Sequence, residues 1–113
     1  DLMIDVRFLP NPYYDPELRP LTGLDEPVAQ FVLTHGTTKK FLKSWFELLD
    51  VVMPGYVQEG KSLLSIAVGC TGGQHRSVAI ARATAEHLTS QGYRVTLFHR
   101  DLDAAQKKSQ QAE

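Results

Sequence analysis

The stretch SIAVGCTGGQHRSVAIARA, residues 65–83, changes character at a pair of glycines. An apolar run precedes the glycines, and an alanine-rich segment that begins behind an arginine follows them. A short continuous apolar run is typical of a strand that is covered on both faces, whereas the apolar residues behind the arginine recur at helical spacing. We therefore predict a strand over residues 62–68, a tight turn, and a helix from Ser77 to about Ser90.

Two further segments alternate between apolar and polar side chains, as strands do. YRVTLF, residues 93–98, completes a strand-helix-strand unit, which predicts parallel strands joined by a right-handed crossover. LMIDVRFL, residues 2–9, predicts another strand that ends at Pro10. Residues 11–23 are rich in proline and predict a structured loop without helix or strand.

Two helices are expected between the proline-rich region and the apolar run. Asp25 can cap a short helix that reaches about Leu33. Thr37 or Thr38 can cap a longer helix, whose apolar stripe includes Trp45 as a core residue and which Pro54-Gly55 ends. The predicted fold class is α/β, with a small, mostly parallel sheet and packed helices.

Length and composition limit the classes of protein. A chain of 113 residues forms one domain, and a net charge of -1 excludes nucleic-acid binding by bulk charge. One cysteine forms no internal disulfide, and no membrane span or signal peptide is visible, so we expect a cytoplasmic protein. The start at Asp1 suggests a piece of a longer protein; we expect one domain over residues 1–102 and a disordered polar tail over 103–113.

The loop between the predicted strand and helix has the composition of an anion-binding site. Ligands of open parallel sheets bind where strands end and helices begin. Paired glycines let successive N–H groups turn toward one centre, the helix dipole adds positive potential, and an arginine adds a forked donor for phosphate. We predict that the loop binds an anion through Gly69, Cys70, Thr71, Gly72, Gly73, Gln74, His75, Arg76 and Ser77.

Charged residues outside the loop can extend this site. Asp5 and Arg7 lie two apart on the first strand and therefore share one side of it, where they form either an internal ion pair or part of the anion pocket. His99 and Arg100 follow the third predicted strand at the same sheet edge as the loop, which makes them a second basic contact. The four histidines show no metal-ligand spacing, so we expect no metal.

A catalytic alternative uses the same loop. Cys70 and Arg76 fit C-x5-R followed by serine, the pattern of cysteine phosphatases, in which a thiolate attacks phosphorus. Gly69 stands where those enzymes usually have a histidine, and no segment obviously supplies a proton to the leaving group. The candidate acids, by default, are Asp5, Asp15 and Asp101. These departures favour binding over catalysis.

Three blocks of the sequence resemble the C-terminal domain of the RapZ/YvcJ family of bacterial nucleotide-binding proteins. They are DVRFLPNPYYDPELRPLTGLDEPV, GCTGGQHRSV and HRDL, and the similarity covers the chain except its tail. The resemblance implies a fold like a phosphofructokinase subdomain and a contribution to homo-oligomers. It also implies ATPase or GTPase activity, with ATP or GTP as the cofactor, in an N-terminal P-loop domain absent from this chain, so no cofactor is expected here.

The RapZ branch of the family adds two expectations about ligands. It implies sensing of glucosamine-6-phosphate, with the phosphate against Gly72, Gly73, His75 and Arg76. The residues left for hydroxyl, amine or second phosphate contacts are Asp5, Arg7, Asn11 and Arg19. It also implies presentation of a small regulatory RNA to an endoribonuclease, with His99, Arg100, Lys107 and Lys108 as RNA contacts. Here acids and glutamines dilute the two lysines, whereas RNA-binding members end in a short basic run.

Overall fold

The computed structural model describes residues 1–102. Its elements, in chain order, are β1 (Leu2–Asp5), the short 3-10 helix η1 (Pro12–Tyr14), α1 (Glu26–Leu33), α2 (Gly36–Gln58), β2 (Ile66–Gly69) and α3 (Arg76–Ser90). β1 and β2 pair in parallel, with Leu2 opposite Ile66 and Asp5 opposite Gly69. This architecture confirms the predicted α/β class with a parallel sheet and packed helices.

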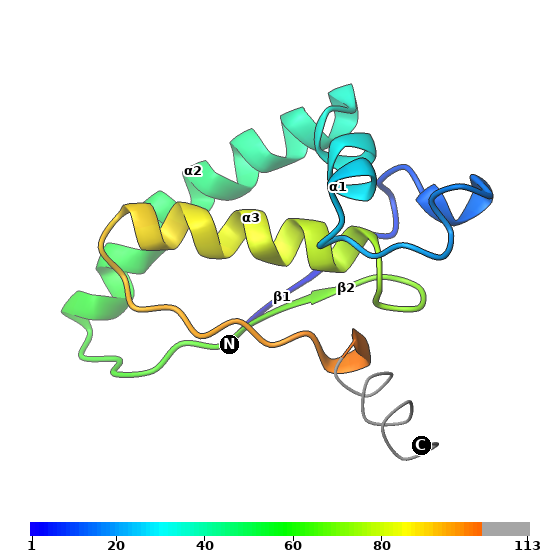
Figure 1. Cartoon of the computed structure of the whole chain (residues 1–113). Helices are drawn as coiled ribbons and strands as arrows, with labels where there is room; N and C mark the ends of the chain where they lie inside the picture. The colour runs from blue at the N-terminus through cyan, green and yellow to red at the C-terminus, as the bar shows by residue number, and fades with distance from the viewer. Residues whose placement is uncertain (103–113) are drawn as a thin grey trace, which may run out of the picture.

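The helices cover one face of the strand pair. Leu2, Ile4, Ile66 and Val68 are half-buried, whereas the side chains that alternate with them, such as Met3, are exposed. Figure 1 shows α1, α2 and α3 on the same side of the two strands. Within the described residues, no helix combines the length and the apolar character that crossing a membrane requires.

Two clusters of buried side chains hold the layers together. One joins the chain after β1 to α1 and α3, through Val6, Leu9, Val28, Val32, Ala79 and Ile80. The other joins α2 to α3, through Trp45, Leu49, Met53 and Leu88. The Trp45 Nε1–H also donates to the Thr84 hydroxyl at 3.1 Å, which confirms the tryptophan as a core residue.

Both predicted ends of the long helix are wrong. His35, rather than Thr37 or Thr38, precedes the first turn, and its Nδ1 accepts from the Thr37 N–H at 3.2 Å. At the other end, α2 runs through Pro54-Gly55 to Gln58. A proline inside a helix removes one backbone donor, but Met53 and Tyr56 on either side pack against the α2–α3 cluster, and this packing outweighs the lost bond.

The structure also corrects the predicted strands. Residues 93–98 form no strand, and β1 and β2 are shorter than predicted. In the described chain, no backbone hydrogen bond involves residues 94–98; Tyr93 and Val95 are attached instead by packing against the α2–α3 cluster. The loop predicted to lack helix contains η1, in which the Asn11 Oδ1 accepts from the Tyr13 N–H at 3.0 Å.

Candidate functional site

The loop from residue 69 to residue 77, here called the glycine loop, connects β2 to α3. Gly72 and Gly73 have φ values of 79° and 66°, the left-handed region in which side chains other than glycine are strained. The carbonyl of Gln74 accepts from the Gly23 N–H at 2.8 Å. The turn therefore depends on glycine at two successive positions and is fastened by a residue distant in sequence.

Most backbone donors of the glycine loop have no acceptor among residues 1–102. Within the described residues, none of the N–H groups of residues 71–76 donates a hydrogen bond. Ser77, the next residue, donates its N–H to the Cys70 Sγ at 3.3 Å. Unpaired N–H groups at the start of a helix are typical of anion-binding sites, because they combine free donors with the positive end of the helix dipole.

Arg76 begins α3 and is almost completely buried, with 4% of its surface exposed. Its Nη1 donates to the carbonyl oxygens of Arg7 and Leu9, whereas its Nε has no hydrogen-bond partner in the described chain. Among residues 1–102, no carboxylate forms an ion pair with it. A buried charge without a counterion costs several kcal/mol unless an anion compensates it, so an anion bound nearby would stabilise this guanidinium.

Asp5 and Arg7 form the ion pair that the sequence left as one of two alternatives. The Arg7 Nη2 lies 2.7 Å from the Asp5 Oδ2, and the Arg7 N–H donates to the Asp5 Oδ1 at 2.9 Å. The Arg7 side chain and then its N–H lower the pKa of Asp5, with a smaller contribution from the charge of Arg76. Asp5 lies opposite Gly69 in the sheet register, so the pair borders the glycine loop.

The other residues expected to contact a ligand form hydrogen bonds within or to the proline-rich loop, residues 10–24. The Arg19 Nε donates to the Tyr13 carbonyl at 2.7 Å, and its guanidinium carbon lies 4.6 Å from the centre of the Tyr13 ring. The His75 Nε2 donates to the Arg19 carbonyl at 3.1 Å. Asn11 and the Arg19 side chain thus bond within their own loop, and His75 joins that loop to the glycine loop. The contact of all three residues with a ligand stays a prediction.

A groove of about 900 Å³ separates the chain that follows α3 from β2 and α3. Where it meets the glycine loop, it is lined by Gly69, Cys70, Gly73, Ser77, His99, Arg100 and Asp101. His99 and Arg100 thus line the same groove as the loop, although no strand carries them there. The His99 Nε2 is buried and has no hydrogen-bond partner in the described residues. Lys107 and Lys108 lie outside the described part of the chain.

Asp101 also lies at this site, although the sequence indicated it only as a candidate proton donor for the phosphatase alternative. Its side chain lies so close to Gly73 that a Cβ built on that glycine would overlap a carboxylate oxygen of Asp101. Its only hydrogen bond in the described chain is a long one, 3.3 Å, from the exposed Arg100 Nε. Proximity to Gly73 depends on the path of residues 93–100, and no local sequence pattern predicts that path.

The geometry gives the phosphatase alternative limited support. Such chemistry needs both the cysteine sulfur and the arginine fork at the phosphoryl group, but the Arg76 Nη1 is held by two carbonyl oxygens. Of the other candidate acids, Asp5 is paired with Arg7, and the Asp15 Oδ1 accepts from the Glu17 N–H at 2.9 Å. No group of three metal-ligating side chains occurs among the described residues.

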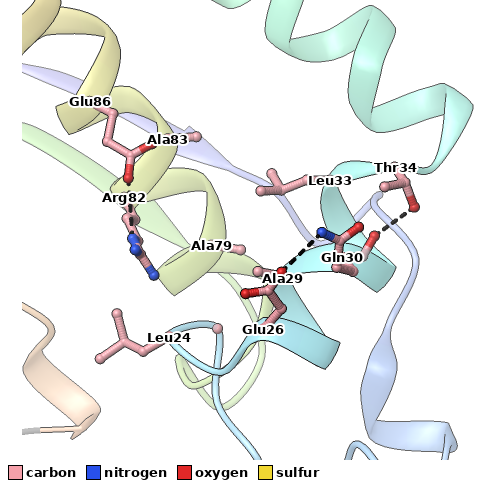
Figure 2. Close-up of a pocket in the computed structure, with 11 residues that line it drawn as sticks. Leu24, Glu26, Ala29, Gln30, Leu33, Thr34, Ala79, Arg82, Ala83 and Glu86 are labelled. Atoms are coloured by element: carbon pink, nitrogen blue, oxygen red, sulfur yellow. Dashed lines mark hydrogen bonds and ion pairs between the residues drawn. The ribbon is translucent and has the colours of Figure 1, made fainter.

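A second hollow, of about 440 Å³, lies between α1 and α3. Figure 2 shows that its polar side chains bond to residues drawn from the same helix: Arg82 to Glu86, Gln30 to Glu26, and the Thr34 hydroxyl to the Gln30 carbonyl. The small side chains Ala29, Ala79 and Ala83 supply the rest of its wall. Because its polar groups are already paired, this hollow offers a ligand less than the glycine loop does.

The fold and the site define an α/β domain with a glycine-rich turn at a strand-to-helix junction. The family described as the RapZ C-terminal domain matches residues 1–103. The chain therefore belongs to the RapZ C-terminal domain family, as its sequence blocks predicted.

Relatives named nucleotide-binding protein agree with this assignment. Those of Carboxydothermus hydrogenoformans and Heliobacterium modesticaldum are 55% and 52% identical over 103 residues, or 91% of this chain. The relative from Lactiplantibacillus plantarum is 53% identical over 103 residues. The chain covers 36%, 34% and 35% of these three proteins, respectively, so it spans about a third of their length.

Proposed function

We propose that this domain binds a phosphorylated metabolite at the glycine loop and acts as a sensing module, with an amino-sugar phosphate such as glucosamine-6-phosphate as the ligand. The phosphate would accept hydrogen bonds from the free N–H groups of residues 71–76 and from the buried guanidinium of Arg76. It would also supply the negative charge that this guanidinium lacks.

The observation that carries the proposal is the state of Arg76. It is 4% exposed, forms no ion pair within the described chain and has a buried Nε without a partner. A buried donor without a partner costs about 1–3 kcal/mol, and more when it is charged. A phosphate beside the six free amides would compensate the buried charge and would gain charge-assisted hydrogen bonds from the amides.

The nucleotide after which the relatives are named belongs, in this proposal, to the part of their length that this chain does not match. Residues 55–62, GYVQEGKS, match the pattern G-x-x-x-x-G-K-[ST], but they run from the last turn of α2 into the chain before β2. The loop that holds nucleotide phosphates in P-loop proteins runs instead from a strand into a helix. ATP or GTP is therefore not the ligand that we assign to the glycine loop.

A titration of the isotopically labelled chain, followed by amide chemical shifts, tests the proposal. We expect glucosamine-6-phosphate to shift the amides of residues 71–76, and glucosamine, which lacks the phosphate, to leave them unchanged. Arg76→Met should weaken binding by roughly tenfold or more because it removes a charge-assisted contact. Arg76→Lys, which keeps the charge, should lose less.

Arg82→Lys is the matched control. Arg82 is also on α3 but is exposed and paired with Glu86 at 3.3 Å, so its replacement should leave the affinity unchanged. If glucosamine binds as well as its phosphate ester, or if Arg76→Met binds undiminished while its spectrum shows a folded domain, the assignment of the loop to phosphate is wrong.

RNA binding is a second candidate function, and the proline-rich loop favours it. Tyr13 and Tyr14 are exposed, and Arg19 lies over the Tyr13 ring at 4.6 Å. Exposed aromatic rings next to arginine are stacking surfaces for unpaired bases. Filter binding of a structured RNA at rising salt should show salt-dependent affinity that Tyr14→Ala reduces. Val51→Ala, at a 73% exposed position on α2, should not reduce it. Absence of salt-dependent binding would leave only the metabolite proposal.

A further inference from the structure

Asp101 adds an acceptor to a site that otherwise consists of donors. The glycine loop offers the N–H groups of residues 71–76, which have no acceptor in the described chain, and the buried guanidinium of Arg76 adds positive charge behind them. Against Gly73, at the rim of this donor surface, lies the Asp101 carboxylate: its Cγ and Cβ are 2.9 and 3.3 Å from the position that a Cβ on Gly73 would take. The two kinds of group therefore meet at one glycine.

The carboxylate is available to a ligand. Its side chain is 35% exposed, and its only partner among residues 1–102 is Arg100 at 3.3 Å, whose own side chain is 84% exposed. An ionised carboxylate has about four acceptor positions, and residues 1–102 occupy only one of them. Ion pairs between exposed groups are weak, so Arg100 neutralises this charge only partly.

We propose that Asp101 is a specificity-determining residue: it selects phosphate esters that carry a hydrogen-bond donor, best a cationic amine, next to the phosphate. This inference rests on the proposed function of the glycine loop. A phosphate at the loop has the carboxylate beside it, and two negative charges in proximity repel each other. A ligand whose ammonium group lies between them replaces this repulsion by attraction.

The same geometry disfavours bare anions. Ligands such as inorganic phosphate, sulfate and simple alkyl phosphates carry no cationic donor for Asp101. Nothing then offsets the repulsion between the anion and the Asp101 carboxylate. Because the carboxylate is partly exposed, the discrimination is limited to that of a surface ion pair, roughly two- to fivefold in affinity. The amides provide most of the affinity, and Asp101 determines the selectivity among phosphorylated ligands.

Two small ligands separate these roles. O-Phosphoethanolamine and ethyl phosphate share a phosphate monoester and a two-carbon chain, but only the first carries an amine. We expect the wild-type chain to bind O-phosphoethanolamine roughly two- to fivefold more tightly, as measured by titration of the amide shifts of residues 71–76. In Asp101→Asn, ethyl phosphate should bind more tightly and O-phosphoethanolamine more weakly, so that the ratio falls to about one.

Glu47→Gln provides the control, because it removes the same charge from an exposed position on α2 and should keep the wild-type ratio. Equal ratios in the wild type and Asp101→Asn, with both ligands shifting the loop amides, would overturn the role of Asp101 and leave the phosphate site intact. If neither ligand shifts the loop amides in either protein, the proposed phosphate site fails and the selectivity fails with it.

Discussion

The proline-rich loop, residues 10–24, and the segment that follows α3, residues 93–98, invert what their sequences predict. The first lacks any apolar periodicity and yet is held by a dense set of hydrogen bonds. The second alternates like a strand and yet forms no backbone hydrogen bond beyond Tyr93 in the described chain. Alternation of apolar and polar residues indicates which side chains can face a core. Pairing of the backbone also requires the edge of a neighbouring strand at the right distance.

Local polar chemistry explains the order of the proline-rich loop. The carbonyl of Asp15 accepts from the N–H groups of Leu18 and Arg19, and its carboxylate accepts from Glu17. Side chains of this kind form turns wherever they stand because their acceptors reach the next backbone donors. At its end, the Gly23 N–H donates to the Gln74 carbonyl and joins this loop to the glycine loop.

Gly23→Ala is expected to have the largest effect on this comparison. A Cβ at Gly23 would lie 2.5 Å from the His75 carbonyl oxygen and 2.6 Å from the Ala79 nitrogen, both backbone atoms that cannot move without displacing α3. We expect a loss of about 2–3 kcal/mol in the free energy of unfolding, measured by urea denaturation. Gly55→Ala, where nothing lies within 4 Å, should be neutral or stabilising; equal losses at both glycines would refute the tight contact.

Amide hydrogen exchange should also distinguish the two regions, with a smaller effect than the loss of stability expected for Gly23→Ala. The amides of Leu21 and Gly23 donate to backbone carbonyls, whereas those of residues 94–98 donate to no acceptor in the described chain. Relative to intrinsic rates, we expect exchange at Leu21 and Gly23 to be at least about tenfold slower than at Val95 and Thr96. Comparable protection at Val95 would mean that this segment pairs as a strand in solution, as its alternation predicts.

Asp5→Asn should have the smallest effect, and only over part of the pH range. Hydrogen bonds from the side chain and then the backbone of Arg7 hold the pKa of Asp5 below its ordinary value of 3.8. A lowered pKa in the folded state stabilises the protein above the unfolded value, and this contribution disappears as the pH falls through the folded value. Urea midpoints should therefore fall less steeply below about pH 4 in Asp5→Asn than in the wild type. Identical acid profiles would show that the pair adds nothing to stability.

Sequence patterns predicted the elements whose own residues determine them. The apolar run before the glycines, the helix behind Arg76 and the stripe that contains Trp45 all follow from local periodicity, and each is present. The pair of glycines in the turn also followed, since positive φ values at Gly72 and Gly73 are a local requirement.

What the patterns missed depends on contacts distant in sequence. The continuation of α2 past Pro54 depends on packing against α3, and the missing third strand depends on where residues 93–98 lie relative to β2. At the site, the carbonyls that hold Arg76 come from Arg7 and Leu9, and the carboxylate at Gly73 comes from Asp101. The residues in these contacts are far apart in the sequence, so local sequence patterns do not predict them.

The register of the two strands has a consequence for how the chain folds. Leu2 pairs with Ile66 and Asp5 with Gly69, so α1 and α2 lie between the partners in sequence. During synthesis, β1 leaves the ribosome well before β2 exists, and it has no edge to pair with until both helices have emerged. Closing so long a connection costs more chain entropy than forming helix contacts between neighbours. The glycine loop, which begins where β2 ends, is therefore completed only after both helices have been made.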